Sequence, residues 1–298
     1  MNALLLLAAC LLLGMLAQRH GRAPRHLPAA LNWWVMNIAL PALVLDLVPR
    51  IHFDPQLWFL VATPWLTFAG AWLVFAAAGA RLGWSRSRIG ALILVAGLGN
   101  TSFMGYPLLE ALRGREGLAL AVVADQLGSF IMLSVGAVAA AAIYTGHRLH
   151  PAAVARRVLT FPSFVALIVG VAAGRWGGWP APVQDVMARL GATLTPLALF
   201  SVGLQLRWRV DRSQWRALSL GLGWKLLTAP LLCWGLGLAL GVKGLVLAVG
   251  VLQAAMGPMI SAAIMADQEG LEPPLANAVL GVGVVLSLLT VPLANALL

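Results

Sequence analysis

Long apolar runs, separated by short polar segments, extend along this entire sequence. A helix needs about 20 apolar residues to cross a lipid bilayer, and most of the runs approach or exceed that length. Of the 298 residues, 61% are hydrophobic and 10% are charged, whereas soluble domains carry about 25% charged residues. One soluble core of this size could not bury so much apolar surface. The sequence therefore predicts an all-α integral membrane protein, surrounded by the lipid bilayer.

The polar breaks divide the sequence into ten predicted spans. Their ranges are 2–17, 29–48, 57–80, 87–112, 116–144, 158–175, 184–206, 214–240, 243–266 and 273–298. The first run is expected to be a true span, because it lacks the preceding basic residue and the following cleavage site of a signal peptide. Ten spans use about 200 residues, so no sizeable soluble domain fits between them.

The basic residues indicate the orientation of the chain. The net charge of +10 suggests nucleic acid or a lipid surface as a partner. Nineteen of the 20 Lys and Arg residues lie in short loops or at span ends, so nucleic acid is not an expected partner. Thirteen of these occupy odd-numbered loops and six occupy even-numbered loops. Because cytoplasmic loops carry the basic excess, we place the odd loops in the cytoplasm and both termini outside.

The signatures of an enzyme or a metal site are missing. All five histidines fall in connecting segments, and Cys10 and Cys233 lie in separate apolar runs, so neither a zinc site nor a disulfide framework is expected. The sequence contains no G-x-S-x-G, H-E-x-x-H or Walker motif. We therefore predict no catalytic residue, no metal and no cofactor. If the chain moves a solute, it would do so passively or on a gradient, with a proton or sodium as candidate coupling ion.

Interrupted spans recur at a spacing of five spans. Pro41 lies within the second span and Pro196 within the seventh, while Gly, Pro and polar residues interrupt the fourth span at 97–107 and the ninth at 253–261. Such residues free backbone groups that hydrocarbon cannot satisfy, so the breaks indicate a protein-lined or wet cavity. Because each half has an odd number of spans, the halves would be inverted in the membrane. Matching breaks in an inverted repeat are typical of a transporter's midplane site, although ordinary helix kinks give the same pattern.

Two charged residues lie inside predicted spans, where burial is costly. Asp125 in the fifth span ionises only if it is paired or hydrated. It is a proton carrier, a cation ligand, an orienting group or a structural hydrogen-bond acceptor. Lys225 in the eighth span would pair with Asp125, face an anionic substrate or extend to the interface.

Acidic residues near the ends of the predicted spans are weaker candidates for a functional role. Asp46 and Glu110 are expected at the interface. The three acidic residues of the ninth loop, Asp267, Glu269 and Glu272, are expected to be solvated.

The run Gly99-Asn100-Thr101-Ser102-Phe103-Met104-Gly105-Tyr106-Pro107-Leu108-Leu109 resembles the auxin efflux carrier family, which includes plant auxin exporters and bacterial permeases for organic acids such as malonate. Further similarity appears at 39–42, 125–128, 253–256 and 288–292, so the resemblance covers nearly the whole chain. The sequence departs from the family at Gly257, where many relatives have proline, and at Gly281 and Gly283, where they often have hydroxyl residues.

The resemblance implies ten transmembrane helices in a 5+5 inverted repeat, related to bile-acid/sodium symporters and sodium/proton antiporters. The first repeat would cover 1–144, a cytoplasmic linker 145–157 and the second repeat 158–298. Spans 1, 2, 6 and 7 would form a scaffold. Spans 3, 4, 5, 8, 9 and 10 would form a moving transport domain, in which helices 4 and 9 cross at their breaks. A bacterial inner-membrane location is implied, and carriers of this architecture are often homodimers.

These features predict a secondary carrier that exports a small carboxylate by elevator-type alternating access. The substrate-binding residues would be Asn100, Thr101, Ser102 and Pro107 at the first break and Gln253, Gly257, Pro258 and Ser261 at the second. The coupling residues would be Asp125, Gln126 and Lys225. A sodium-coupled symporter or a cation/proton antiporter on the same scaffold is the alternative, although the sequence shows no adjacent pair of membrane carboxylates. A sensor or intramembrane enzyme is a third reading, disfavoured by the short loops.

Overall fold

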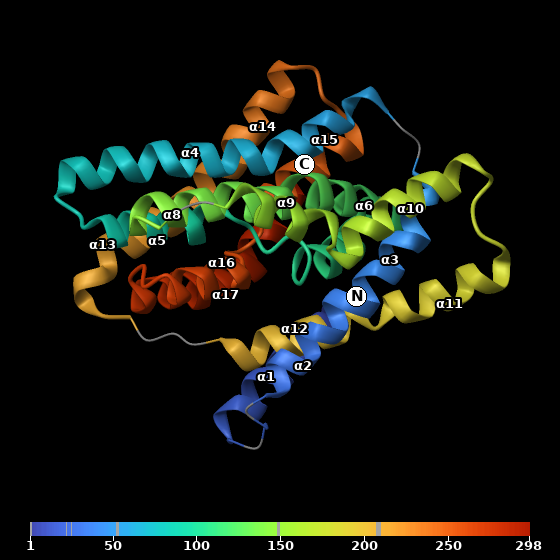
Figure 1. The fold of residues 1–298 in the computed structure, drawn as a ribbon, viewed down its shortest axis with the longest axis horizontal. Helices are drawn as coiled ribbons and strands as arrows, with labels where there is room; N and C mark the ends of the chain where they lie inside the picture. Colours follow the sequence, from blue (N-terminus) through green and yellow to red (C-terminus); the bar gives the residue numbers. More distant parts are fainter. Residues whose placement is uncertain (1, 22, 25, 52–53, 148–149, 207–209) are drawn as a thin grey trace. The chain divides into compact units, whose positions relative to one another are not determined.

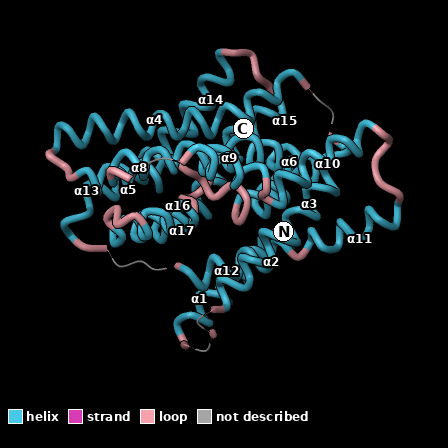
Figure 2. Tube along the Cα trace, viewed as in Figure 1, coloured by secondary structure: helices cyan, strands magenta, loops and turns pink. Residues whose placement is uncertain are grey.

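The computed structural model describes the chain apart from residues 1, 22, 25, 52–53, 148–149 and 207–209. The described part is helical without strands, as Figure 2 shows. Its α-helices are α1 (Asn2–Arg19), α2 (Leu27–Trp34), α3 (Leu40–Leu47), α4 (Trp58–Leu82), α5 (Arg86–Gly97), α6 (Gly105–Val123), α7 (Phe130–Met132), α8 (Val138–Thr145), α9 (Pro151–Leu159), α10 (Pro162–Arg175), α11 (Ala181–Ala192), α12 (Leu194–Gln205), α13 (Trp215–Gly223), α14 (Ala229–Ala239), α15 (Gly244–Ala255), α16 (Ile260–Gln268) and α17 (Pro273–Leu297). Five arginines counted for the orientation lie outside the described residues: Arg22, Arg25, Arg148, Arg207 and Arg209.

Several helices are joined through short turns of other helical types. The wider π turns are η1 (Val35–Ala39), η4 (Ala124–Ser129), η5 (Leu133–Ala137) and η7 (Trp224–Thr228), and the tighter 3₁₀ turns are η2 (Val48–Arg50), η3 (Pro55–Leu57) and η6 (Arg212–Gln214). The turn η1 precedes Pro41, and a one-residue interruption at Thr193 precedes Pro196. Both predicted proline interruptions are therefore confirmed as irregular backbone.

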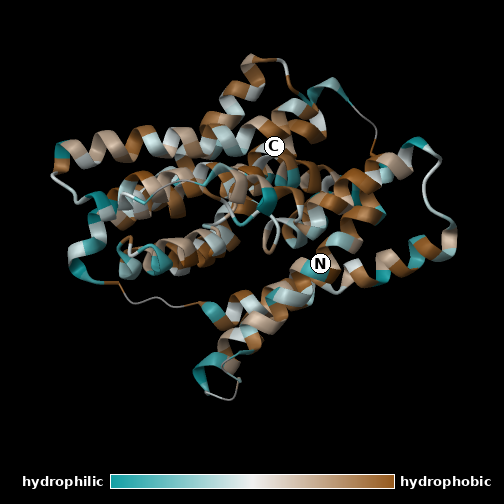
Figure 3. Ribbon diagram, viewed as in Figure 1, coloured by the Kyte–Doolittle hydropathy of each residue, from teal (hydrophilic) through white to brown (hydrophobic). Residues whose placement is uncertain are grey.

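The helical lengths support a membrane protein. Among the described residues, six helical segments are long and apolar enough to cross a membrane, and a seventh is reached if the bent pair α9 and α10 counts as one span. Figure 3 shows hydrophobic residues over most of the ribbon and hydrophilic residues at several turns. The count of ten spans stays a prediction. The helix α9 was not predicted, because most of its residues, 151–157, fall within the expected linker 145–157.

The chain divides into two compact units. Unit 1 comprises Met1–Asp54, Ser102–Val122 and Ala155–Leu206, and unit 2 comprises Pro55–Thr101, Val123–Val154 and Arg207–Leu298. In unit 1, α1 packs along α12, and α3 packs against α10 and α11 (Figure 1). The Trp34 indole donates a hydrogen bond of 3.0 Å to the Thr193 hydroxyl. This bond links the last residue of α2 to the residue before α12.

In unit 2, α4 packs against α5, α15 and the π turn η4, while α17 packs against α5, α15 and α16. The turn from α4 to α5 follows from two local signals. Gly83 ends α4 in the left-handed conformation with φ of 65°, which glycine adopts without a Cβ clash. Ser85 then caps α5 by accepting a hydrogen bond from the Arg88 amide at 3.2 Å. These helices hold the two broken segments described next.

Candidate functional site

Two interrupted helices meet in unit 2. The helix α5 ends at Gly97 and continues into extended backbone at Leu98, with φ of −109° and ψ of 127°. The helix α15 ends at Ala255, and α16 begins at Ile260 after an extended stretch. The sequence predicted breaks at both places, and the structure confirms them.

The two unwound stretches pair as a short antiparallel bridge between Gly99 and Pro258. The Asn100 amide donates to the Gly257 carbonyl at 2.8 Å, and the Met259 amide donates to the Leu98 carbonyl at 3.1 Å. The bonds are therefore made by the flanking residues, so the position of Pro258 needs no N–H donor. The pairing explains how proline fits into a backbone that is otherwise hydrogen-bonded.

Close packing against α17 holds the second stretch in place. A Cβ atom added at Gly283 would lie 2.5 Å from the Cδ atom and 2.7 Å from the Cγ atom of Pro258. A Cβ atom at Gly257 would lie 2.7 Å from the Ser287 hydroxyl. Two glycines that depart from the family pattern are thus the residues that allow this close approach.

A chain of polar side chains links the first stretch to the fifth predicted span. The Thr101 hydroxyl donates to the Asp125 carboxyl at 2.5 Å, and the Gln126 amide donates to the same carboxyl at 2.9 Å. The Gln253 amide from α15 reaches the Thr101 carbonyl at 3.4 Å. Four predicted site residues are therefore brought together here.

Asn100 differs from these residues. Its side chain is 2% exposed, and its Nδ2 donor has no hydrogen-bond partner among the described residues. A buried donor without an acceptor costs about 1–3 kcal/mol. Such a donor beside a broken helix is available to a ligand that accepts hydrogen bonds.

Lys225 is buried at the same crossing. Its side chain is 1% exposed, and its ammonium donates to the Ala254 carbonyl at 3.0 Å near the end of α15. Of the three alternatives left open for Lys225, extension to the interface is therefore excluded. Tertiary packing of η7 against α15, which the sequence does not display, keeps the ammonium inside the protein.

A small cavity adjoins Lys225, and the space open to the centre of a water molecule is about 10 Å³. That volume is close to the minimum for a single water molecule. The cavity is lined by Pro64, Thr67, Gly97, Leu98, Gly99, Thr101, Ser129, Lys225, Gln253 and Ala254. Thr67 and Ser129 were not predicted as site residues, because a lone hydroxyl in an apolar span gives no sequence signal.

The remaining predicted residues have other positions. Ser261 is half-buried in the first turn of α16. Ser102 is half-buried in the turn after Thr101, and Pro107 is buried in the first turn of α6. These two residues belong to unit 1, whereas the bridge belongs to unit 2.

Asp46, which was expected at the interface, is fully buried in unit 1. Its carboxylate accepts hydrogen bonds from Arg50, at 2.7 Å, and from Arg115. The prediction failed because Arg115 lies far away in the sequence. Arg50, one helical turn from Asp46, was the local signal for a paired carboxylate. Glu110 is exposed.

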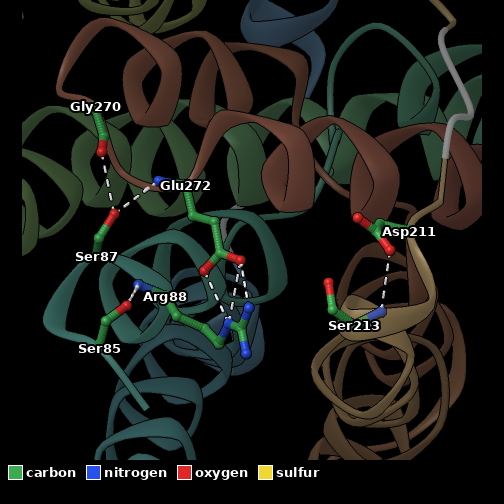
Figure 4. Close-up of polar contacts among 7 residues, drawn as sticks. All are labelled: Ser85, Ser87, Arg88, Asp211, Ser213, Gly270 and Glu272. Carbon is green, nitrogen blue, oxygen red and sulfur yellow. Dashed lines mark hydrogen bonds and ion pairs between the residues drawn. The ribbon is translucent and has the colours of Figure 1, made fainter.

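The ninth loop is more ordered than predicted. The Arg88 guanidinium binds both carboxylate oxygens of Glu272, with contacts of 2.7 and 2.9 Å, and Ser87 bonds to the Glu272 amide and the Gly270 carbonyl (Figure 4). Glu269 accepts a contact of 2.8 Å from the His147 ring. The expectation of solvation is therefore wrong for Glu272, whereas Glu269 is partly exposed and Asp267 is exposed. The contacts place the third, fifth and ninth loops at one end of unit 2.

Comparison with known proteins finds relatives that match most of the chain. A transporter of uncharacterized function from Methanothermobacter thermautotrophicus is 27% identical over 290 residues, covering 96% of this chain and 94% of the relative. Another uncharacterized transporter, from Methanocaldococcus jannaschii, is 24% identical over 263 residues, covering 82% and 81%. The relatives are transporters rather than enzymes, in agreement with the prediction. A family model described as membrane transport protein matches residues 1–143 and 147–294, so the chain belongs to this family of auxin efflux carrier type.

Proposed function

We propose that this membrane transporter is a secondary carrier, an efflux permease for a small organic anion such as an auxin-like or dicarboxylic acid. The observation that carries the proposal is the bridge between Gly99 and Pro258, with the unsatisfied Asn100 donor beside it. A carboxylate would accept the hydrogen bond that Asn100 offers. The first turn of α16, which begins three residues after Gly257, adds amide groups and the positive end of a helix dipole.

The substrate site would be formed by Asn100 and Thr101 at the first break and by Gly257, Pro258 and Ser261 at the second. Gln253 and Asp125 would support this site through Thr101, since their side chains bond to its carbonyl and hydroxyl groups. Ser102 and Pro107, which belong to unit 1, stay predictions from the sequence. The acid itself is larger than a water molecule, so it would not enter the cavity at Lys225.

Alternating access would be of the elevator type. The division of the chain supports this mechanism, because the predicted scaffold spans 1, 2, 6 and 7 all fall in unit 1. Spans 3, 8, 9 and 10 of the predicted transport domain fall in unit 2. The fourth and fifth spans are shared, since Ser102–Val122 groups with unit 1.

The proposed architecture is the ten-span inverted repeat in a bacterial inner membrane, with odd loops in the cytoplasm. The contacts of Glu272 with Arg88 and of Glu269 with His147 support this arrangement, because they join three odd-numbered loops of unit 2. A cysteine-accessibility map in intact cells would test it. Labelling of the third and ninth loops from opposite sides of the membrane would contradict it.

The site is tested by comparing Asn100→Ala with Asn37→Ala in proteoliposomes. The Asn37 amide already donates to the Trp33 carbonyl in its own helix, so its loss serves as the control. A screen of small carboxylates by thermal unfolding, with and without sodium, would first identify a carried acid. We expect Asn100→Ala to abolish its uptake and Asn37→Ala to retain it. Unchanged uptake by Asn100→Ala would remove this residue from the site, and uptake that requires sodium would favour the sodium-coupled alternative.

A further inference from the structure

Lys225 carries a charge that the proposed chemistry of carboxylate binding does not use. Lys225 is the charged residue in the lining of the small cavity. Its ammonium donates a hydrogen bond to the Ala254 carbonyl. Among the described residues, the ion pairs do not include Lys225. A buried charge needs compensation, so its partner has to be sought in the backbone.

The backbone around this cavity is negative at two points. The helix α5 ends at Gly97 and α15 ends at Ala255, and residues of both ends line the cavity. Each helix C-terminus carries about half a negative charge, because its last carbonyl groups lack amide partners. The hydroxyl groups of Thr67, Thr101 and Ser129 add further oxygen atoms to the lining.

Carbonyl and hydroxyl oxygens at the ends of broken helices are ligands that suit a monovalent cation. Here the position beside the Ala254 carbonyl is taken by the Lys225 ammonium. The first break leaves room for this group at Gly99, where an added Cβ atom would lie 2.9 Å from the Nζ atom.

We propose that the Lys225 ammonium is a tethered cation, which takes the place of a free coupling cation between the ends of α5 and α15. The carrier would then work without sodium or potassium. The statement about coupling rests on the proposed function, because it concerns the same crossing of α5 and α15.

A pair of variants separates the charge from the space that it fills. Lys225→Ala removes the ammonium and leaves room for a free ion beside the Ala254 carbonyl. Lys225→Met removes the charge but fills the space with an uncharged chain of similar length. Thermal unfolding of each purified protein would be followed in sodium, potassium, ammonium and choline chloride at equal ionic strength, without any carboxylate.

We expect the wild-type unfolding temperature to be the same in all four salts. The unfolding temperature of Lys225→Ala should rise with the concentration of sodium or ammonium relative to choline, because an ion that binds only the folded state stabilises it. Lys225→Met should show no such rise. Equal responses of the two variants, or sodium-dependent stability of the wild type, would overturn the proposal.

Two further measurements test the proposal if the variants do not fold. If neither variant folds, the wild-type salt series decides by itself, since a protein with a free cation site responds to the cation. The carboxylate screen on the wild type tests the proposed substrate class separately. A tethered cation is thus supported or lost independently of which acid is carried.

Discussion

Proline interrupts the helices of this protein in two different ways. At the π turns η1 and η7, which precede Pro41 and Pro230, the residue before each proline still donates its amide hydrogen bond within the same helix. The Leu40 amide donates to the Val35 carbonyl, and the Ala229 amide donates to the Trp224 carbonyl. At Pro258 the backbone leaves the helix, and the bonds go to the stretch around Asn100, more than 150 residues away.

The difference shows that proline alone does not decide whether a membrane helix bends or unwinds. An unwound stretch needs partners for its backbone groups, because hydrocarbon offers none. Here the second broken segment provides those partners, so the two breaks depend on each other. A π turn needs only its own helix, and it can be lost or gained without a distant partner.

The largest expected effect comes from disturbing the contact between the second broken segment and α17. Gly283→Ala places a methyl group 2.5 Å from the Cδ atom of Pro258, in contact with a rigid ring. We expect a loss of about 3 kcal/mol in stability, at the upper end of overpacking effects. Gly235→Ala in α14 is the control, since its Cβ would meet nothing within 4 Å. Thermal unfolding in detergent measures both, and equal stabilities would show that the break tolerates displacement.

A smaller effect is expected from the polar chain beside the bridge. Thr101→Val removes the hydroxyl that donates to Asp125 and keeps the shape of the side chain. We expect a loss of about 2 kcal/mol, since a buried carboxyl group loses a donor. Thr63→Val is the matched control, because the Thr63 hydroxyl donates to the Leu60 carbonyl within its own helix. If both variants unfold at the same temperature, the bond from Thr101 to Asp125 adds nothing to stability.

The smallest effect distinguishes the two roles of proline directly. Pro258→Ala removes the ring that packs against Gly283 and adds an amide hydrogen where the bridge bonds are already made by Asn100 and Met259, and we expect a loss of about 1 kcal/mol. Pro41→Ala restores an amide that the helix can use, so its stability should stay equal or rise slightly. Unfolding curves of the two variants test the contrast. A destabilised Pro41→Ala together with an unaffected Pro258→Ala would reverse the comparison.

The sequence was sufficient to predict the broken helices but not their pairing. Glycine, proline and polar residues gather at 97–107 and 253–261, and this local composition identified both breaks. The alignment of Gly99 with Pro258 depends on how α5 and α15 pack, which local composition does not contain. Local patterns also left open whether a proline unwinds its helix, because that outcome depends on a second segment.

Long-range charge pairs were missed for a related reason. Asp46 was expected at the interface, yet Arg115 and Arg50 allow it to be buried. Glu272 was expected in water, yet Arg88, 184 residues away, binds it. Sequence position predicts exposure well only where a charged group has no distant partner. The hydrogen-bond partner of Lys225 could not be predicted either, since it is a main-chain carbonyl on another helix.

The bridge at Pro258 allows the opening of the two broken segments to be followed by amide exchange. Because proline has no amide proton, the pairing presents two protons to deuterium exchange, those of Asn100 and Met259. Their exchange rates would report the opening of one small, defined piece of backbone against the background of long, protected helices. The main chain therefore carries two reporters of its own, and neither requires a change of sequence.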